Sequence, residues 1–220
     1  MEQPERVTRD IRIDEAVPLA IELQKRGQLT DAEEVYRRYL EIRPDDPEGL
    51  HYSGVLAQQQ GRSEEAVALV ERSLALRPDL ADWHSNLGIV LKAQGRIDEA
   101  VAAYRRAIAL DPDHANAQNN LGVLLRTQDK LEEAEEAYRA AVRANPKHLE
   151  AWHNLGTLLA ASKRLKEAIT CYCTVTTLCP DHPAARRSLA IAHAHLGEMD
   201  KATAIYREWL DEEPDNPVAR

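Results

Sequence analysis

The chain has 220 residues, with 28 basic and 37 acidic side chains, and its formal net charge is −9 at pH 7. This excess of negative charge disfavours binding to a phosphate backbone, so we expect no nucleic-acid partner. No apolar run approaches the length of a membrane-spanning helix, and the charged start MEQPERVTRDIR lacks the apolar core of a signal peptide. We therefore expect no membrane insertion and a cytoplasmic location.

The segment from Ala81 to His114 shows how the chain is built. Its first half carries apolar residues three and four places apart, the spacing of one helical face. Gly95 interrupts this pattern, Asp98 follows where a helix N-cap is expected, and a second apolar period runs until Pro112 stops it. The segment predicts two helices joined by a tight turn.

This unit of thirty-four residues recurs six times without a gap. A proline and an alanine mark the same two places in every copy: Pro44, Pro78, Pro112, Pro146, Pro180 and Pro214, and Ala32, Ala66, Ala100, Ala134, Ala168 and Ala202. A fixed period of this kind is typical of solenoids, in which each unit buries its apolar face against its neighbours.

The repeat resembles the tetratricopeptide repeat family. The family pattern stands most clearly in one copy, at Trp152, Leu155-Gly156, Ala168, Tyr172 and Pro180. The resemblance implies an all-α, right-handed solenoid (a superhelix) of six antiparallel helix pairs, with turns near Gly27, Gly61, Gly95, Asp129, Lys163 and Gly197. Three residues depart from the pattern: Ser53 replaces the leucine, Val70 replaces the aromatic residue, and Trp83 lies one place off.

In chain order, residues 1–12 are expected to be a disordered extension. The six repeats follow at 13–46, 47–80, 81–114, 115–148, 149–182 and 183–216, and 217–220 would open a further helix.

The first two repeats carry the most unusual residues. Pro18 belongs in or before the first turn of a helix, so the first helix should start near Glu15. Thr30 and Glu33 have the spacing of a capping box, so the second helix should open at Thr30. The second repeat has Gly49 and Gly54 in its first helix, which makes it the softest expected place.

The sixth repeat ends with Tyr206, Trp209 and Leu210 on its last helix. A solenoid needs a polar cap at each end, so we expect this helix to present an apolar face. The chain would then be a piece of a longer protein, or self-associate through this uncapped helix.

Histidine and cysteine invite a metal or thiol site, and the geometry argues against one. His114, His148 and His182 lie in successive repeats, too far apart to share one ion, and are expected to cap or pack at turns. Cys171 and Cys173 point to opposite sides of one helix, so free thiols are expected. With no phosphate loop, zinc motif or nucleophile elbow, we expect no catalytic site and no cofactor.

In the family, the first helix of each pair lines the concave wall. At one place on this wall the middle repeats carry Asn86, Asn120 and Asn154, a row that resembles the asparagine ladder in the superhelical repeats of O-linked N-acetylglucosamine transferase. An amide can pair with both the carbonyl and the N–H of a peptide backbone. Alternatively, asparagine is simply common at this place in the family.

Two further rows are expected on the same wall. The first is an apolar row that includes Ile89 and Val123, which would either face the groove or lie partly buried between helices. The second is a set of cations, Lys92, Arg126 and Arg187, which favours an extended peptide with some acidic character. The remaining candidates for the peptide groove are Asn116, Asn119 and His153.

The sequence thus predicts a scaffold that holds an extended peptide or a partner protein in the groove. The alternative is the substrate-recruiting arm of a larger glycosyltransferase or methyltransferase whose catalytic domain follows residue 220. A chaperone-tail adaptor is disfavoured, because His51 and Val55 stand where the family's carboxylate clamp needs lysine and asparagine.

Overall fold

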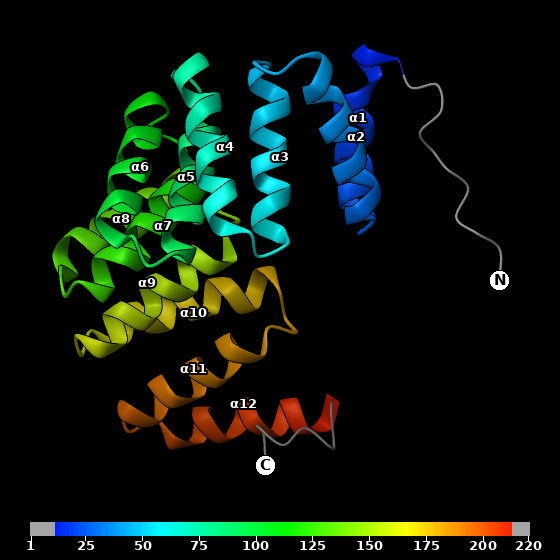
Figure 1. Cartoon of the computed structure of the whole chain (residues 1–220). Helices are drawn as coiled ribbons and strands as arrows, with labels where there is room; N and C mark the ends of the chain where they lie inside the picture. The colour runs from blue at the N-terminus through cyan, green and yellow to red at the C-terminus, as the bar shows by residue number, and fades with distance from the viewer. Residues whose placement is uncertain (1–11, 213–220) are drawn as a thin grey trace. The chain divides into compact units, whose positions relative to one another are not determined.

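The computed structural model describes residues 12–212, and over this range it contains twelve α-helices and no strand. The all-α prediction is confirmed, with the two helices of each predicted pair packed together (Figure 1). The helices are α1 (Ile13–Lys25), α2 (Leu29–Ile42), α3 (Pro47–Gln59), α4 (Ser63–Leu76), α5 (Ala81–Ala93), α6 (Ile97–Leu110), α7 (Ala115–Thr127), α8 (Leu131–Ala144), α9 (Leu149–Ala161), α10 (Leu165–Leu178), α11 (Pro183–His195) and α12 (Met199–Glu212).

The chain forms two compact units, Met1–Pro112 and Asp113–Arg220, which we call unit 1 and unit 2. In unit 1 the first helices of successive pairs, α1, α3 and α5, contact one another, and in unit 2 the same holds for α7, α9 and α11. We call each of these sets the first-helix face of its unit. The second helix of a pair also packs on the first helix of the next pair, as α2 does on α3 and α8 on α9.

All six predicted turns have the same backbone. The second residue after the first helix has a positive φ in each: Gly27, Gly61, Gly95, Asp129, Lys163 and Gly197. The next N–H reaches back five residues to a carbonyl, for example from Gln28 to Leu23 at 2.9 Å and from Arg164 to Leu159 at 2.9 Å. This is a Schellman end, which needs a left-handed residue and so favours glycine.

The turn is shorter than the capping motifs suggested, and both expected caps are wrong. The second helices begin directly after the left-handed residue and its successor, so Arg96 occupies the N-cap of α6 and Asp98 lies inside its first turn. Likewise Gln28 is the N-cap of α2, and Thr30 is already helical. Neither N-cap side chain accepts a capping hydrogen bond from the helix backbone, because the Schellman end leaves no room for a separate capping residue.

Four of the six first helices are capped by a side chain instead, and histidine caps three of them. The Nδ1 atoms of His114, His148 and His182 accept hydrogen bonds from the backbone N–H three residues on, at 3.2–3.3 Å. Asp46 does the same for α3, accepting from Gly49 N–H at 2.8 Å. The expectation that the turn histidines cap is therefore confirmed.

Small residues allow the helices of a pair to approach closely. The recurring alanine of the second helices is buried in every repeat. Opposite the tyrosine of repeats three to five stands a glycine, and a Cβ added at Gly122 would lie 2.7 Å from the ring of Tyr138. Such contacts leave no space for a larger side chain.

The second repeat, predicted to be the softest place, has both of its helical glycines at close contacts between helices. A Cβ at Gly49 would lie 2.7 Å from the ring of Tyr39, and one at Gly54 would lie 2.7 Å from Val70. Tyr39 stands where the next three repeats carry Ser73, Ala107 and Ala141, and Gly49 gives it room. The helix-propensity cost is thus matched by close contacts that a larger residue would exclude.

The two ends differ from expectation in detail. α1 begins at Ile13, two residues before the predicted start, and Pro18 lies inside the helix with its ring exposed, so one intrahelical hydrogen bond is absent. Trp209 of α12 is only 2 % exposed, with the Arg186 guanidinium 5.9 Å from its ring centroid, which corrects the expected exposed face at this residue. The expected disordered extension, apart from Arg12, and the segment 217–220 lie outside the described residues.

Candidate peptide-binding faces

The candidate site residues fall on four first helices, one in unit 1 and three in unit 2. In unit 1, Asn86, Ile89 and Lys92 lie along α5. In unit 2, α7 carries Asn116, Asn119, Asn120, Val123 and Arg126, α9 carries His153 and Asn154, and α11 carries Arg187. Each set is described within its own unit.

The asparagines are partly engaged in hydrogen bonds between neighbouring repeats. Asn86 Nδ2 lies 3.0 Å from His51 Nε2, and Asn154 Nδ2 donates to Asn119 Oδ1 at 3.0 Å. In both pairs the partner is thirty-five residues earlier, on the preceding first helix. We call this set of contacts the polar seam. It gives these asparagines a structural role in joining repeats, and it makes Asn119, only 4 % exposed, a seam residue rather than an open groove residue.

Asn120 differs from the other two members of the row. It is half-buried on α7, and no hydrogen bond joins its side chain to another residue in the described part of the chain. Its amide therefore keeps both its donors and its acceptor for a bound peptide backbone.

His51 is a member of the polar seam that was not among the candidate site residues predicted from the sequence. It is 1 % exposed, its ring stacks on Trp83 with centroids 4.5 Å apart and planes 8° apart, and burial lowers its pKa to about 4. The histidine is thus neutral at pH 7, and its Nε2 accepts the hydrogen bond from Asn86. A signal was present in the sequence, since His51 stands three repeats before His153 at the same place.

Positive charge gathers on the first-helix face of unit 2. Burial lowers the pKa of His153 most, and the nearby charges of His182, Arg126 and Arg187 lower it further. The guanidinium groups of Arg126 and Arg187 form no ion pair or hydrogen bond with another described residue. Two unpaired guanidinium groups around a histidine form a field that attracts carboxylates.

The apolar row is exposed in part. Ile89 is 38 % exposed and Ile191 is 44 % exposed, whereas Val123 is half-buried. The exposure of this row therefore differs from repeat to repeat. Asn116, in the first turn of α7, is exposed.

Thiol and metal chemistry find no support among the described residues. They contain no group of three or more histidine, cysteine or acidic side chains placed to hold a metal ion. Cys171 is buried and Cys173 is exposed, as expected for opposite sides of α10, whereas Cys179 is the residue that follows this helix. Burial raises the pKa of Cys171 to about 11, so its thiol is protonated and unreactive at neutral pH.

Over residues 12–212, no helix has the length and apolar character that crossing a membrane requires.

Comparison with family models identifies the repeat. Models described as tetratricopeptide repeat match residues 47–113 and, with a second model, 85–146, 127–174 and 174–217. The chain belongs to the tetratricopeptide repeat family. A search of curated proteins finds no significant match.

Solved structures of tetratricopeptide repeat and related proteins share the fold. PilF of Pseudomonas aeruginosa is 20 % identical, with a TM-score of 0.82 and 94 % of both chains covered. PilW, a type IV pilus biogenesis factor, is 17 % identical, with a TM-score of 0.81 over 96 % of this chain and 98 % of its own. YrrB, described as a tetratricopeptide repeat protein with an unusual peptide-binding site, is 22 % identical, with a TM-score of 0.68 over 85 % and 96 %. At these identities the likeness is one of fold.

Proposed function

We propose that this tetratricopeptide repeat chain is a scaffold that binds an extended acidic segment of a partner protein on the first-helix face of unit 2. The proposal rests chiefly on two cations, Arg126 of α7 and Arg187 of α11. Their guanidinium groups form no ion pair or hydrogen bond among the described residues, and their charges lower the pKa of His153 on α9. Hydrogen bonds to charged groups contribute about 1.5–3 kcal/mol each, enough for two guanidinium groups to set a preference for carboxylates.

The surroundings suit a peptide in an extended conformation. Asn120 offers an amide to the peptide backbone, and Ile191 offers an exposed apolar contact for a side chain. Asn154 retains one N–H and its oxygen beyond the bond to Asn119, so it assists more weakly. A peptide-binding site in the structurally similar YrrB is consistent with this use of the fold.

The test is a selection of short random peptides on the full chain, followed by affinity measurements of the selected peptides. We expect enrichment of aspartate and glutamate, and a weakening of tenfold or more in the Arg126→Glu, Arg187→Glu double variant. The matched control is Lys130→Glu with Lys147→Glu, which makes the same charge change at exposed positions of unit 2 outside its first helices. Equal weakening by both pairs would mean that net charge alone governs binding.

A further inference from the structure

Unit 1 has a pocket of about 400 Å³ that is lined by residues of α2, α3 and α4. Leu40, Leu56 and Leu69 supply its apolar lining, and Ser53 lies among them. The Ser53 hydroxyl oxygen is buried and has no hydrogen-bond partner. No described side chain therefore accounts for a hydroxyl at this place.

The repeat itself shows which side chain fits this space. The place of Ser53 is taken by Leu87, Leu121, Leu155 and Leu189 in the four following repeats. Leu87 packs against the cluster that contains Val70 and Leu74, and these are the equivalents of Tyr36 and Leu40, which line the pocket. The other three leucines are buried, at 1–8 % exposure. The part of the pocket beside Ser53 is therefore the place that a leucine side chain occupies in the later repeats.

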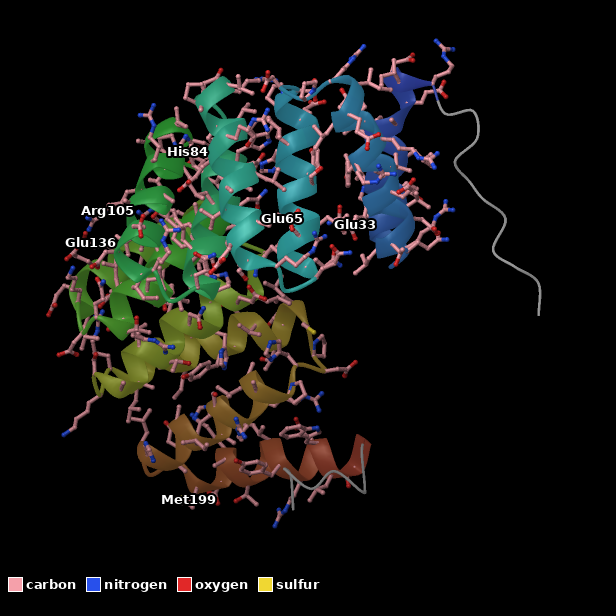
Figure 2. The ribbon with its side chains drawn as sticks, viewed as in Figure 1. Glu33, Glu65, His84, Arg105, Glu136 and Met199 are labelled. Atoms are coloured by element: carbon pink, nitrogen blue, oxygen red, sulfur yellow. The ribbon has the colours of Figure 1, made fainter. Side chains whose placement is uncertain are left out.

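The charged rim of the pocket is already neutralised. Arg62 donates to Glu33 of α2 at 2.8 Å and to Glu65 of α4 at 2.6 Å, two carboxylates labelled in Figure 2. Arg37 pairs with Glu34 at 2.8 Å and also with Glu41. Because these guanidinium groups are occupied, the rim favours a neutral occupant over an anion.

We propose that this pocket receives a leucine side chain from a partner protein, which completes the packing that Ser53 leaves open. Tyr36 and Leu40 offer it the contacts that Val70 and Leu74 offer Leu87, and Leu56 and Leu69 add apolar surface. A side chain inserted from a partner would bury its apolar surface there at about 25 cal/mol per Å². This second docking point lies on the α2–α4 surface and does not depend on the acidic-segment face of unit 2.

The experiment uses N-acetyl-leucine amide as the probe and methyl and amide NMR of the full chain as the measurement. We expect saturable shifts at Leu40, Leu56 and Leu69, and none of comparable size with N-acetyl-alanine amide, which is too short to fill the space. The decisive variant is Ser53→Leu, which supplies the repeat's own leucine. It should raise the melting temperature and abolish the probe-induced shifts.

Two results would overturn the proposal. Shifts that persist in Ser53→Leu would place the probe elsewhere, and an absence of shifts at the three leucines of the native chain would show that the pocket takes no leucine. The variant's melting temperature checks the premise separately, since a lower value would mean that position 53 has no room for the side chain. Failure of the Arg126 and Arg187 test leaves these results unaffected.

Discussion

Units 1 and 2 share one repeat and one fold but present different charges on their first helices. At the second residue of each first helix, unit 1 has Asp14, Glu48 and Asp82, whereas unit 2 has Asn116, Glu150 and Ala184. Unit 2 carries two arginines, Arg126 and Arg187, whose side chains form no ion pair among the described residues, whereas unit 1 has one lysine, Lys92, at the place of Arg126 and Ser85 at that of Arg187. The comparison teaches that the repeat fixes the residues that pack between helices, while the charges at exposed positions of the first helices can vary between units.

The two units also differ inside the polar seam and at the turns. Unit 1 buries a histidine, His51, where unit 2 buries an amide, Asn119. The turns of unit 1 all use glycine at positive φ, whereas two turns of unit 2 use Asp129 and Lys163. Each difference allows a variant that transfers the feature of one unit into the other.

The largest expected effect concerns pH and His51. Its pKa in the folded chain is lowered from 6.5 to about 4 by burial, so the unfolded chain binds the proton more readily. The contribution of neutral His51 is fully present above pH 6.5 and is lost as the pH falls from 6.5 toward 4. A shift of about 2.5 units (6.5 minus 4) corresponds to roughly 3 kcal/mol at most.

Chemical denaturation of the full chain across this pH range measures the loss. The His51→Asn variant gives unit 1 the non-titrating amide of unit 2, and it should lose less stability than the native chain between pH 6.5 and 4. Parallel curves for the two proteins would mean that His51 is not the titrating group.

The next effect separates the structural asparagine from the open one. Asn86→Ala removes the partner of a buried histidine nitrogen and should destabilise the chain by about 1–3 kcal/mol. Asn120→Ala removes no hydrogen bond within the described residues and should stay within about 0.5 kcal/mol. Thermal unfolding of both variants measures the difference, and equal losses would contradict the distinction drawn between the two residues.

The smallest effect concerns the turns. Lys163 has a φ of 61°, a conformation that costs a residue with a Cβ about 1 kcal/mol, so Lys163→Gly should stabilise the chain by up to this amount. Gly95→Lys makes the opposite exchange in unit 1 and should destabilise it similarly. Melting temperatures that move in the same direction for both variants would rule out this account of the turn.

The sequence predicted the fold well because the repeat encodes it redundantly. The proline stop and the recurring alanine appear six times, and the left-handed turns at Asp129 and Lys163 were placed correctly although neither is glycine. The capping motifs at Thr30 and Asp98 predicted the wrong helix starts. The Schellman turn sets where the second helix begins, so the N-caps are Gln28 and Arg96. The periodicity of the whole chain is thus a stronger signal than one capping motif.

The candidate face was only partly predictable. The position of Asn86 in the repeat identifies its helix face, but its bond to His51 depends on a side chain in the preceding repeat. Likewise, the burial of Trp209 depends on how α12 packs, as does its contact with Arg186. Contacts between repeats such as Asn86–His51 decide whether a polar residue is free for a ligand, and one repeat read alone does not contain them; the Trp209–Arg186 contact lies within the sixth repeat and depends on two side chains outside the repeat motif.

The most direct measurement of the proposed function is an NMR map of a selected acidic peptide bound to the full chain. We expect the largest shifts on α7, α9 and α11, at Asn120, Arg126, His153 and Arg187, with little change on α1, α3 and α5. Shifts concentrated on α8, α10 and α12, or on unit 1, would contradict the claim that the first-helix face of unit 2 binds the acidic segment.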